Sequence, residues 1–110
     1  MPTIISGKNF KLSNPLKDYV SAKLHKLEKY SEHIIASKAE LDHDVNQRTG
    51  TVYRAELSVT VPGAILMAGQ KAEHMREAID RCVQKLQMQI TKYEKKKIER
   101  PRRAGARNKK

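Results

Sequence analysis

The segment from about His74 to Lys97 places the strongest constraint on the fold, because seven of its apolar residues fall on one side of a predicted helix. At about 100° per residue they lie within an arc of roughly 100°. A helix with an apolar side of this kind must pack against another layer of structure. The apolar residues are Met75, Ile79, Cys82, Val83, Leu86, Ile90 and Tyr93.

A second, shorter helix is predicted from Ser13 to about Tyr30. Ser13 is a typical capping residue, and Pro15 suits the first turn, where its missing N–H costs nothing. Lys23 projects into the apolar side of this helix, so it must reach solvent along the edge or meet a partner there. The apolar positions, within an arc of about 80°, are Leu16, Val20, Leu24 and Leu27.

Strands account for the remaining regular structure. Residues 53–61 alternate apolar and polar side chains with a period of two, which indicates a strand with one buried face and one solvent-exposed face. Other strands are predicted at 3–10, 36–45 and 64–71, with turns at 46–50 and 62–63. The order β-α-β-β-β-α predicts an α+β fold in which both helices cover one face of a four-stranded sheet. A right-handed crossover makes the first two strands parallel, and the rest follow as an antiparallel meander.

The net charge of +11 is concentrated at the C-terminal end. Residues 92–110 hold ten Lys or Arg against two Glu, whereas residues 1–91 hold thirteen basic against ten acidic side chains. A cationic segment of this kind favours a polyanionic partner, and nucleic acid is the usual one. We expect a domain over 1–97 and a basic tail over 98–110, because Pro101 should end the helix and the tail composition should keep it disordered until bound.

Basic residues also gather on the predicted helices. Lys26 and Lys29 flank the apolar side of the first helix, and a row of cations follows one side of the second. With both helices on the same face of the sheet, we expect these residues to form one basic surface. The row on the second helix consists of Arg81, Lys85, Lys92, Lys95 and Lys96.

Little in the sequence indicates an enzyme, and we expect neither catalysis nor a cofactor. The one candidate metal cluster is Asp42-His43-Asp44, but alternate residues of a strand point to opposite faces and would not converge on one ion. Cys82 has no partner for an internal disulfide, fits a reducing compartment and is predicted to be a buried apolar residue. No apolar run is long enough for a membrane span, and the N-terminus has no signal pattern.

Three segments resemble one known family. They are Gly7-Lys8-Asn9, residues 16–28 (LKDYVSAKLHKLE) and residues 75–80 (MREAID), in family order and spacing. Over about residues 1–97 the chain resembles the ribosome hibernation-promoting factor family, which includes the ribosome-associated inhibitors and was formerly called the sigma-54 modulation protein family. The resemblance implies a fold like that of double-stranded-RNA-binding domains. Two residues depart from the family pattern. His74 stands where the family usually has Asp or Asn, and Arg76 stands where it often has Tyr.

The resemblance also implies a function. A short-form member would bind the small ribosomal subunit and its 16S-type rRNA in the mRNA and tRNA groove of bacterial cytoplasmic ribosomes. It would inhibit translation and store inactive ribosomes under stress or in stationary phase. It would be a monomer off the ribosome, with a separate factor pairing ribosomes. Lys23, Lys26, Lys85 and Lys92 match family positions; the full set expected to contact rRNA adds Lys29, Arg81, Lys95, Lys96, Arg100, Arg102 and Arg103.

Two other classes of function stay open from the residues alone. A general double-stranded-RNA-binding module or regulator would show the same excess of charge. A protein-binding regulator would need an apolar patch, and the polar face of the strand at 53–61 offers none: its side chains are Arg54, Glu56, Ser58 and Thr60.

Overall fold

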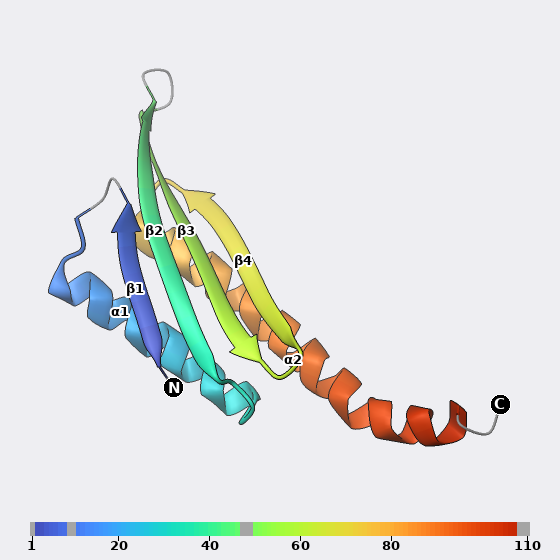
Figure 1. The fold of residues 1–110 in the computed structure, drawn as a ribbon. Helices are drawn as coiled ribbons and strands as arrows, with labels where there is room; N and C mark the ends of the chain where they lie inside the picture. The colour runs from blue at the N-terminus through green and yellow to red at the C-terminus, as the bar shows by residue number, and fades with distance from the viewer. Residues whose placement is uncertain (1, 9–10, 47–49, 108–110) are drawn as a thin grey trace.

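The computed structural model describes residues 2–8, 11–46 and 50–107, with side chains described for 2–8, 11–43 and 52–96. The predicted element order is confirmed (Figure 1). The chain forms β1 (Thr3–Lys8), α1 (Asn14–Lys26), the 3-10 turn η1 (Leu27–Tyr30), β2 (Ala36–Asn46), β3 (Gly50–Val61), β4 (Ala64–Ala72) and α2 (Met75–Arg107).

The four strands form one sheet in the order β1-β2-β3-β4. β1 pairs with β2 in parallel, and the β2–β3 and β3–β4 pairs are antiparallel, as expected. The β3–β4 connection is the tight turn at Pro62 and Gly63, where Gly63 has a φ of 82°. Glycine suits this position because a Cβ disfavours positive φ. Part of the predicted turn at 46–50 lies outside the described residues.

Both helices cover the same face of the sheet, as the sequence predicted (Figure 1). The α1 cap is also confirmed, since the Ser13 hydroxyl accepts a hydrogen bond from the Leu16 N–H at 3.3 Å. At α2 the carbonyl of His74 accepts from the N–H of Ala78 at 3.1 Å, which places His74 at the N-cap position. The departure from the family pattern at His74 therefore does not shift the start of the helix.

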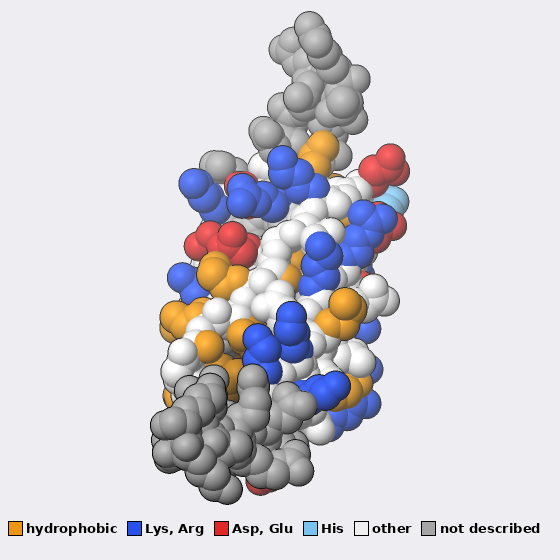
Figure 2. Space-filling model, turned by 90° about the vertical axis from the view of Figure 1, so that its right-hand side faces the viewer, with side chains coloured by type: hydrophobic (Ala, Val, Ile, Leu, Met, Phe, Trp, Pro, Cys, Tyr) orange, Lys and Arg blue, Asp and Glu red, His pale blue; other side chains and the backbone are white. Residues whose placement is uncertain are grey.

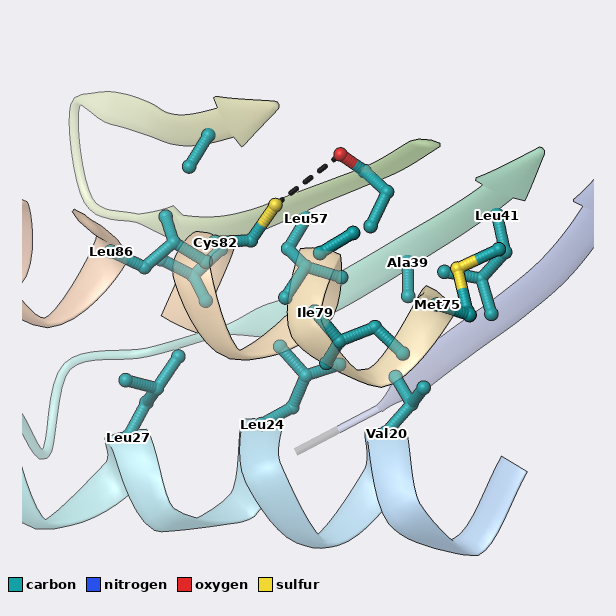
Figure 3. Close-up of a cluster of buried hydrophobic side chains, with 14 of the residues drawn as sticks. Val20, Leu24, Leu27, Ala39, Leu41, Leu57, Met75, Ile79, Cys82 and Leu86 are labelled. Carbon is teal, nitrogen blue, oxygen red and sulfur yellow. Dashed lines mark hydrogen bonds between the residues drawn. The ribbon is translucent and has the colours of Figure 1, made fainter. Parts of the chain in front are cut away.

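The core lies between the helices and the sheet (Figure 3). Leu24 of α1 and Ile79 of α2 are fully buried and lie between the two helices and the strands behind them. Cys82 donates from Sγ to the carbonyl of Ala55 on β3 at 3.2 Å, and burial raises the pKa of its thiol to about 11. The prediction that Cys82 is a buried apolar residue is confirmed.

The C-terminal end of α2 differs from the prediction. The helix continues through Pro101 as far as Arg107, so the expectation that Pro101 ends it is wrong. Proline removes one backbone hydrogen bond and crowds the preceding turn, but helices can bend and continue past it. The division into a domain over 1–97 and a tail over 98–110 stays a prediction, and of this tail the backbone of 98–107 is helical.

The outer face of the sheet is less polar than β3 alone predicts. In register, Ile4, Lys38, Ser58 and Met67 form one row across the four strands, and Ile65 lies in the next row. Ile4, Ile65 and Met67 are each more than half exposed and line a shallow hollow of about 380 Å³. The outward side chains of β3 are polar as predicted, but the neighbouring strands supply apolar side chains between them, so the face as a whole carries an apolar patch.

Candidate nucleic-acid interface

The first basic row lies on α1 and η1, on the side that faces α2. Lys26 and Lys29 are exposed there, and Lys29 Nζ lies 5.3 Å from the ring centroid of Tyr30. This distance is within the range of a cation–π contact. Lys23 completes the row and is the least exposed of the three, with 29% of its side chain accessible.

Lys23 meets a partner at the edge of the core, one of the two outcomes that the sequence allowed. Its Nζ lies 3.4 Å from Oδ1 of Asp80 on α2 and 5.4 Å from the ring centroid of Tyr19. The Tyr19 hydroxyl donates to the same carboxylate oxygen at 2.5 Å. Asp80 therefore joins α1 to α2 and holds Lys23 at the boundary between the helices.

A second cation packs against Tyr19. The guanidinium of Arg76 lies 4.9 Å from the ring centroid, so the ring contacts a positive group from each helix. Burial and the hydrogen bond to Asp80 raise the pKa of the Tyr19 hydroxyl to about 12, so it remains a hydrogen-bond donor at neutral pH. In the sequence Arg76 stands out only as a departure from the family pattern, and nothing in its spacing shows that it meets Tyr19.

The second basic row lies on the opposite flank of α2. Arg81 donates to the carbonyl of Lys71 on β4 at 3.3 Å and pairs with Glu77 at 3.4 Å, so it faces the β4 edge. Lys85 and Lys92 share this flank by helical geometry, and both are exposed. Figure 2 views the molecule from the side where β4 and the end of α2 lie, and Lys and Arg side chains are spread along it.

The two rows are not adjacent, although the sequence had suggested that they would form one basic surface. Along α2, the flank with Asp80 and Gln87 lies roughly 130° around the helix from the flank with Arg81 and Lys92. Between them runs an outward strip that is uncharged at Gln84, Met88 and Thr91. Met88 is 69% exposed, and the charged side chains of Glu77 and Lys95 lie before and after these three positions on the same side of the helix. The helix layer therefore presents two parallel basic rows separated by a neutral strip.

The remaining predicted contact residues lie toward the C-terminal end of α2. Lys95 and Lys96 are exposed. The backbone of Arg100, Arg102 and Arg103 continues the helix where α2 projects beyond the sheet (Figure 1). Their side chains lie outside the described part of the structure.

A groove separates α1 from α2 between the basic rows. It has a volume of about 260 Å³, and its lining combines the α1 lysines with two glutamine side chains of α2, Gln84 and Gln87. No motif in the sequence distinguishes these glutamines. Their spacing of three places them on one side of a helix, but only the packed structure shows that this side faces the lysines.

Another contact between α2 and the α1–β2 connection was also missed. The hydroxyl of Ser31 donates to Oε2 of Glu94, and Nδ1 of His33 lies 2.9 Å from the same oxygen. The contact spans more than 60 residues of sequence. It fixes the far end of the groove, because it ties α2 to the segment directly after η1.

Of the candidate metal cluster Asp42-His43-Asp44, the structure describes the side chains of Asp42 and His43, and the side chain of Asp44 lies outside the described part. The ring of His43 stacks on Tyr53 with a centroid distance of 5.9 Å, and Asp42 lies on the outer face of the sheet beside Arg54 and Lys8. Within the described residues, no group of three His, Cys, Asp or Glu side chains could hold a metal ion. No described helix is long and apolar enough to cross a membrane.

Comparison with known proteins agrees with the fold and decides the family. The family model described as Sigma 54 modulation protein / S30EA ribosomal protein matches residues 3–98. The chain belongs to this family. The predicted family resemblance is therefore confirmed.

Several curated members of this family are similar to the chain over most of its length. It is 30% identical over 100 residues to the ribosome hibernation promoting factor of Azotobacter vinelandii, covering 91% of this chain and 89% of that protein. It is 33% identical over 92 residues to the ribosome hibernation promotion factor of Deinococcus radiodurans, covering 81% of this chain. The match spans only 47% of the Deinococcus protein, so the chain corresponds to about half of such longer relatives.

Solved structures give the same fold. The N-terminal domain of Thermus thermophilus Protein Y superposes with a TM-score of 0.72 at 26% identity, over 84% of this chain and 99% of that one. A ribosomal subunit interface protein from Coxiella burnetii has a TM-score of 0.74 at 21% identity, over 86% and 98% of the two chains. The expected four-stranded sheet with two helices is confirmed.

Proposed function

We propose that this chain is a ribosome hibernation factor that binds the small ribosomal subunit in the groove used by mRNA and tRNA. Bound there, it inhibits translation and keeps ribosomes inactive and protected under stress or in stationary phase of a bacterial cell. The names of its relatives in Azotobacter and Deinococcus support the hibernation role. The separate ribosome-pairing factor and the monomeric state off the ribosome remain predictions.

The observation that carries the proposal is the distribution of charge over the two layers. The layer formed by α1 and α2 presents two basic rows, one on each side of the neutral strip. Among the described side chains of the outer sheet face, positive and negative groups nearly balance: Lys8, Lys38, Arg54 and Lys71 against Glu40, Asp42 and Glu56. Two separated rows suit two neighbouring phosphate backbones, and phosphate contacts position a protein on A-form RNA, whose major-groove base edges are hidden.

The test is co-sedimentation with purified small subunits at physiological salt, with naked double-stranded RNA as competitor. We expect about one copy per subunit to remain bound in the presence of the competitor. The variant Lys85→Ala/Lys92→Ala should bind more weakly and reduce the dependence of log affinity on log salt by roughly one unit for each lost contact. The control Lys8→Ala/Lys38→Ala removes the same charge from the outer sheet face and should bind like the unmodified chain.

Two outcomes would contradict the proposal. Transfer of the protein to the competitor RNA would favour the general double-stranded-RNA-binding module. Equal losses for the helix-layer and sheet-face variants would show that total charge, rather than these rows, determines binding.

A further inference from the structure

The groove between α1 and α2 has two chemically different walls. Lys26 and Lys29 line one wall with ammonium groups, and Gln84 and Gln87 line the other with neutral amides. Its volume of about 260 Å³ lies slightly below the roughly 300–1,000 Å³ of sites that take drug-sized ligands. The groove therefore suits one small ligand that carries both a negative charge and a neutral, hydrogen-bonding part.

The two amides are available for such a ligand. Among the described residues, the side-chain amides of Gln84 and Gln87 have no hydrogen-bond partner. Gln89 on the other flank differs, because its Nε2 donates to the carbonyl of Met67 at 2.7 Å. Gln89 thus holds α2 against β4, while the groove glutamines contribute no bond that the described fold needs.

The lysine wall can accept only limited negative charge. Lys23 is already paired with Asp80, and the carboxylate of Asp80 also lines the groove. A second phosphate near Asp80 would meet like charge, whereas a phosphate at Lys26 and Lys29 would not. The charge pattern therefore allows an anion at one end of the groove and favours a neutral group beside the amides.

We infer that this groove binds a single unpaired nucleotide of RNA, with its phosphate at Lys26 and Lys29 and its base edge at Gln84 and Gln87. A glutamine amide both donates and accepts, as a base edge requires, and glutamine can pair with a base through two hydrogen bonds. The nucleotide must be unpaired, because the major-groove base edges, with which glutamine makes such a pair, lie in an A-form duplex in a deep, narrow groove that side chains cannot read. The inference rests on the proposed function, and it deepens it by naming a feature of the RNA that this surface reads.

The test compares two RNA probes, a plain duplex and the same duplex with one unpaired, bulged nucleotide. Binding of the full chain is measured by fluorescence anisotropy over a range of salt concentrations. The full chain should bind the bulged probe about tenfold more tightly than the duplex, as expected for a bidentate amide–base contact. Gln84→Ala/Gln87→Ala should abolish this preference without changing duplex affinity or the salt dependence, because it removes no charge.

Two control variants separate the parts of the site. Lys26→Ala/Lys29→Ala should weaken binding to both probes and reduce the salt dependence. Met88→Ala, an exposed apolar change on the neutral strip of the same helix, should leave both affinities and the bulge preference as they are. Thermal unfolding of each variant should match that of the unmodified chain, because all these side chains are exposed or half-exposed.

The inference is overturned if the full chain shows no preference for the bulge, or if the double glutamine variant keeps that preference. Its failure can be distinguished from failure of the proposed function by small-subunit co-sedimentation of the same preparations. Retention on subunits without a bulge preference refutes the inference alone. A bulge preference without retention on subunits refutes the ribosomal role and supports binding of an unpaired nucleotide in the groove.

Discussion

The hydroxyl of Tyr19 on α1 donates to the carboxylate of Asp80 on α2 at 2.5 Å, across 61 residues of sequence. The same carboxylate oxygen pairs with Lys23 at 3.4 Å. A negative charge inside a basic surface would weaken phosphate binding if its only effect were electrostatic. Here it also fixes the spacing of the two helices and thereby the width of the groove between them.

Asp80→Ala should therefore lower the free energy of unfolding by about 1–2 kcal/mol, because it removes the acceptor of a hydrogen bond to a charged group. The ion pair with Lys23 adds at most about 1 kcal/mol, since both side chains are partly exposed. Urea unfolding of Asp80→Ala, Tyr19→Phe and the double variant measures the coupling. Strictly additive losses in this cycle would mean that the Tyr19–Asp80 bond does not stabilise the fold.

Stability should also fall at alkaline pH because of Tyr19. Its pKa is raised from 10.0 to about 12 in the folded chain, so unfolding makes the phenol more acidic. The contribution of Tyr19 is complete below pH 10 and is lost as the pH rises through about 12. Unfolding measured across this window should show a smaller loss for Tyr19→Phe, and an equal loss would contradict the assignment.

Cys82 should be protected from thiol reagents in the folded protein. Its side chain is fully buried, and burial raises the pKa of the thiol to about 11, so little thiolate exists at neutral pH. Modification should proceed at the rate of unfolding and accelerate in urea. Fast modification without denaturant would show that the layer between α2 and β3 opens locally.

Pro101→Ala should strengthen the end of α2. Alanine restores the backbone N–H that proline lacks and removes the clash of its ring with the preceding turn, effects worth about 3 kcal/mol in a helix interior. Amide hydrogen exchange over residues 97–107 should slow in this variant and remain unchanged around β3. Unchanged exchange at the helix end would mean that the proline does not limit its stability.

Removal of residues 98–110 should weaken binding to small subunits and reduce its salt dependence, because six basic side chains are lost. A matched control replaces Arg100, Arg102 and Arg103 by Lys, which keeps the charge but changes the geometry. If the control binds like the unmodified chain, the tail acts through charge. Unchanged affinity and salt dependence after the deletion would show that the tail makes no contact.

Much of the fold could be predicted from local pattern. The alternation at 53–61, the capping signal at Ser13 and the apolar side of the helix after His74 each specify an element and the face it buries. The end of α2 could not be predicted in this way. The helix-breaking tendency of Pro101 is a local rule, and the structure carries the helix past that residue.

The candidate site was predictable by residue type but not by arrangement. Helical periodicity identified the cations of both helices, and the position of Lys23 indicated that it would either reach solvent or meet a partner at the edge. Periodicity along one helix cannot show which flank faces a neighbour. That information comes from contacts between distant segments, such as Asp80 with Tyr19 and Arg81 with the carbonyl of Lys71.

The contrast between the cationic helix layer and the nearly balanced outer sheet face has a consequence for the approach to a polyanion. It gives the described part of the molecule an electric dipole that runs through its thickness, from sheet to helices. The field of a polyanion exerts a torque on such a dipole. It turns the protein so that the helix layer faces the polyanion before any atoms touch. The hollow lined by Ile4, Ile65 and Met67 then arrives facing solvent, so orientation is selected during diffusion as well as by the final fit.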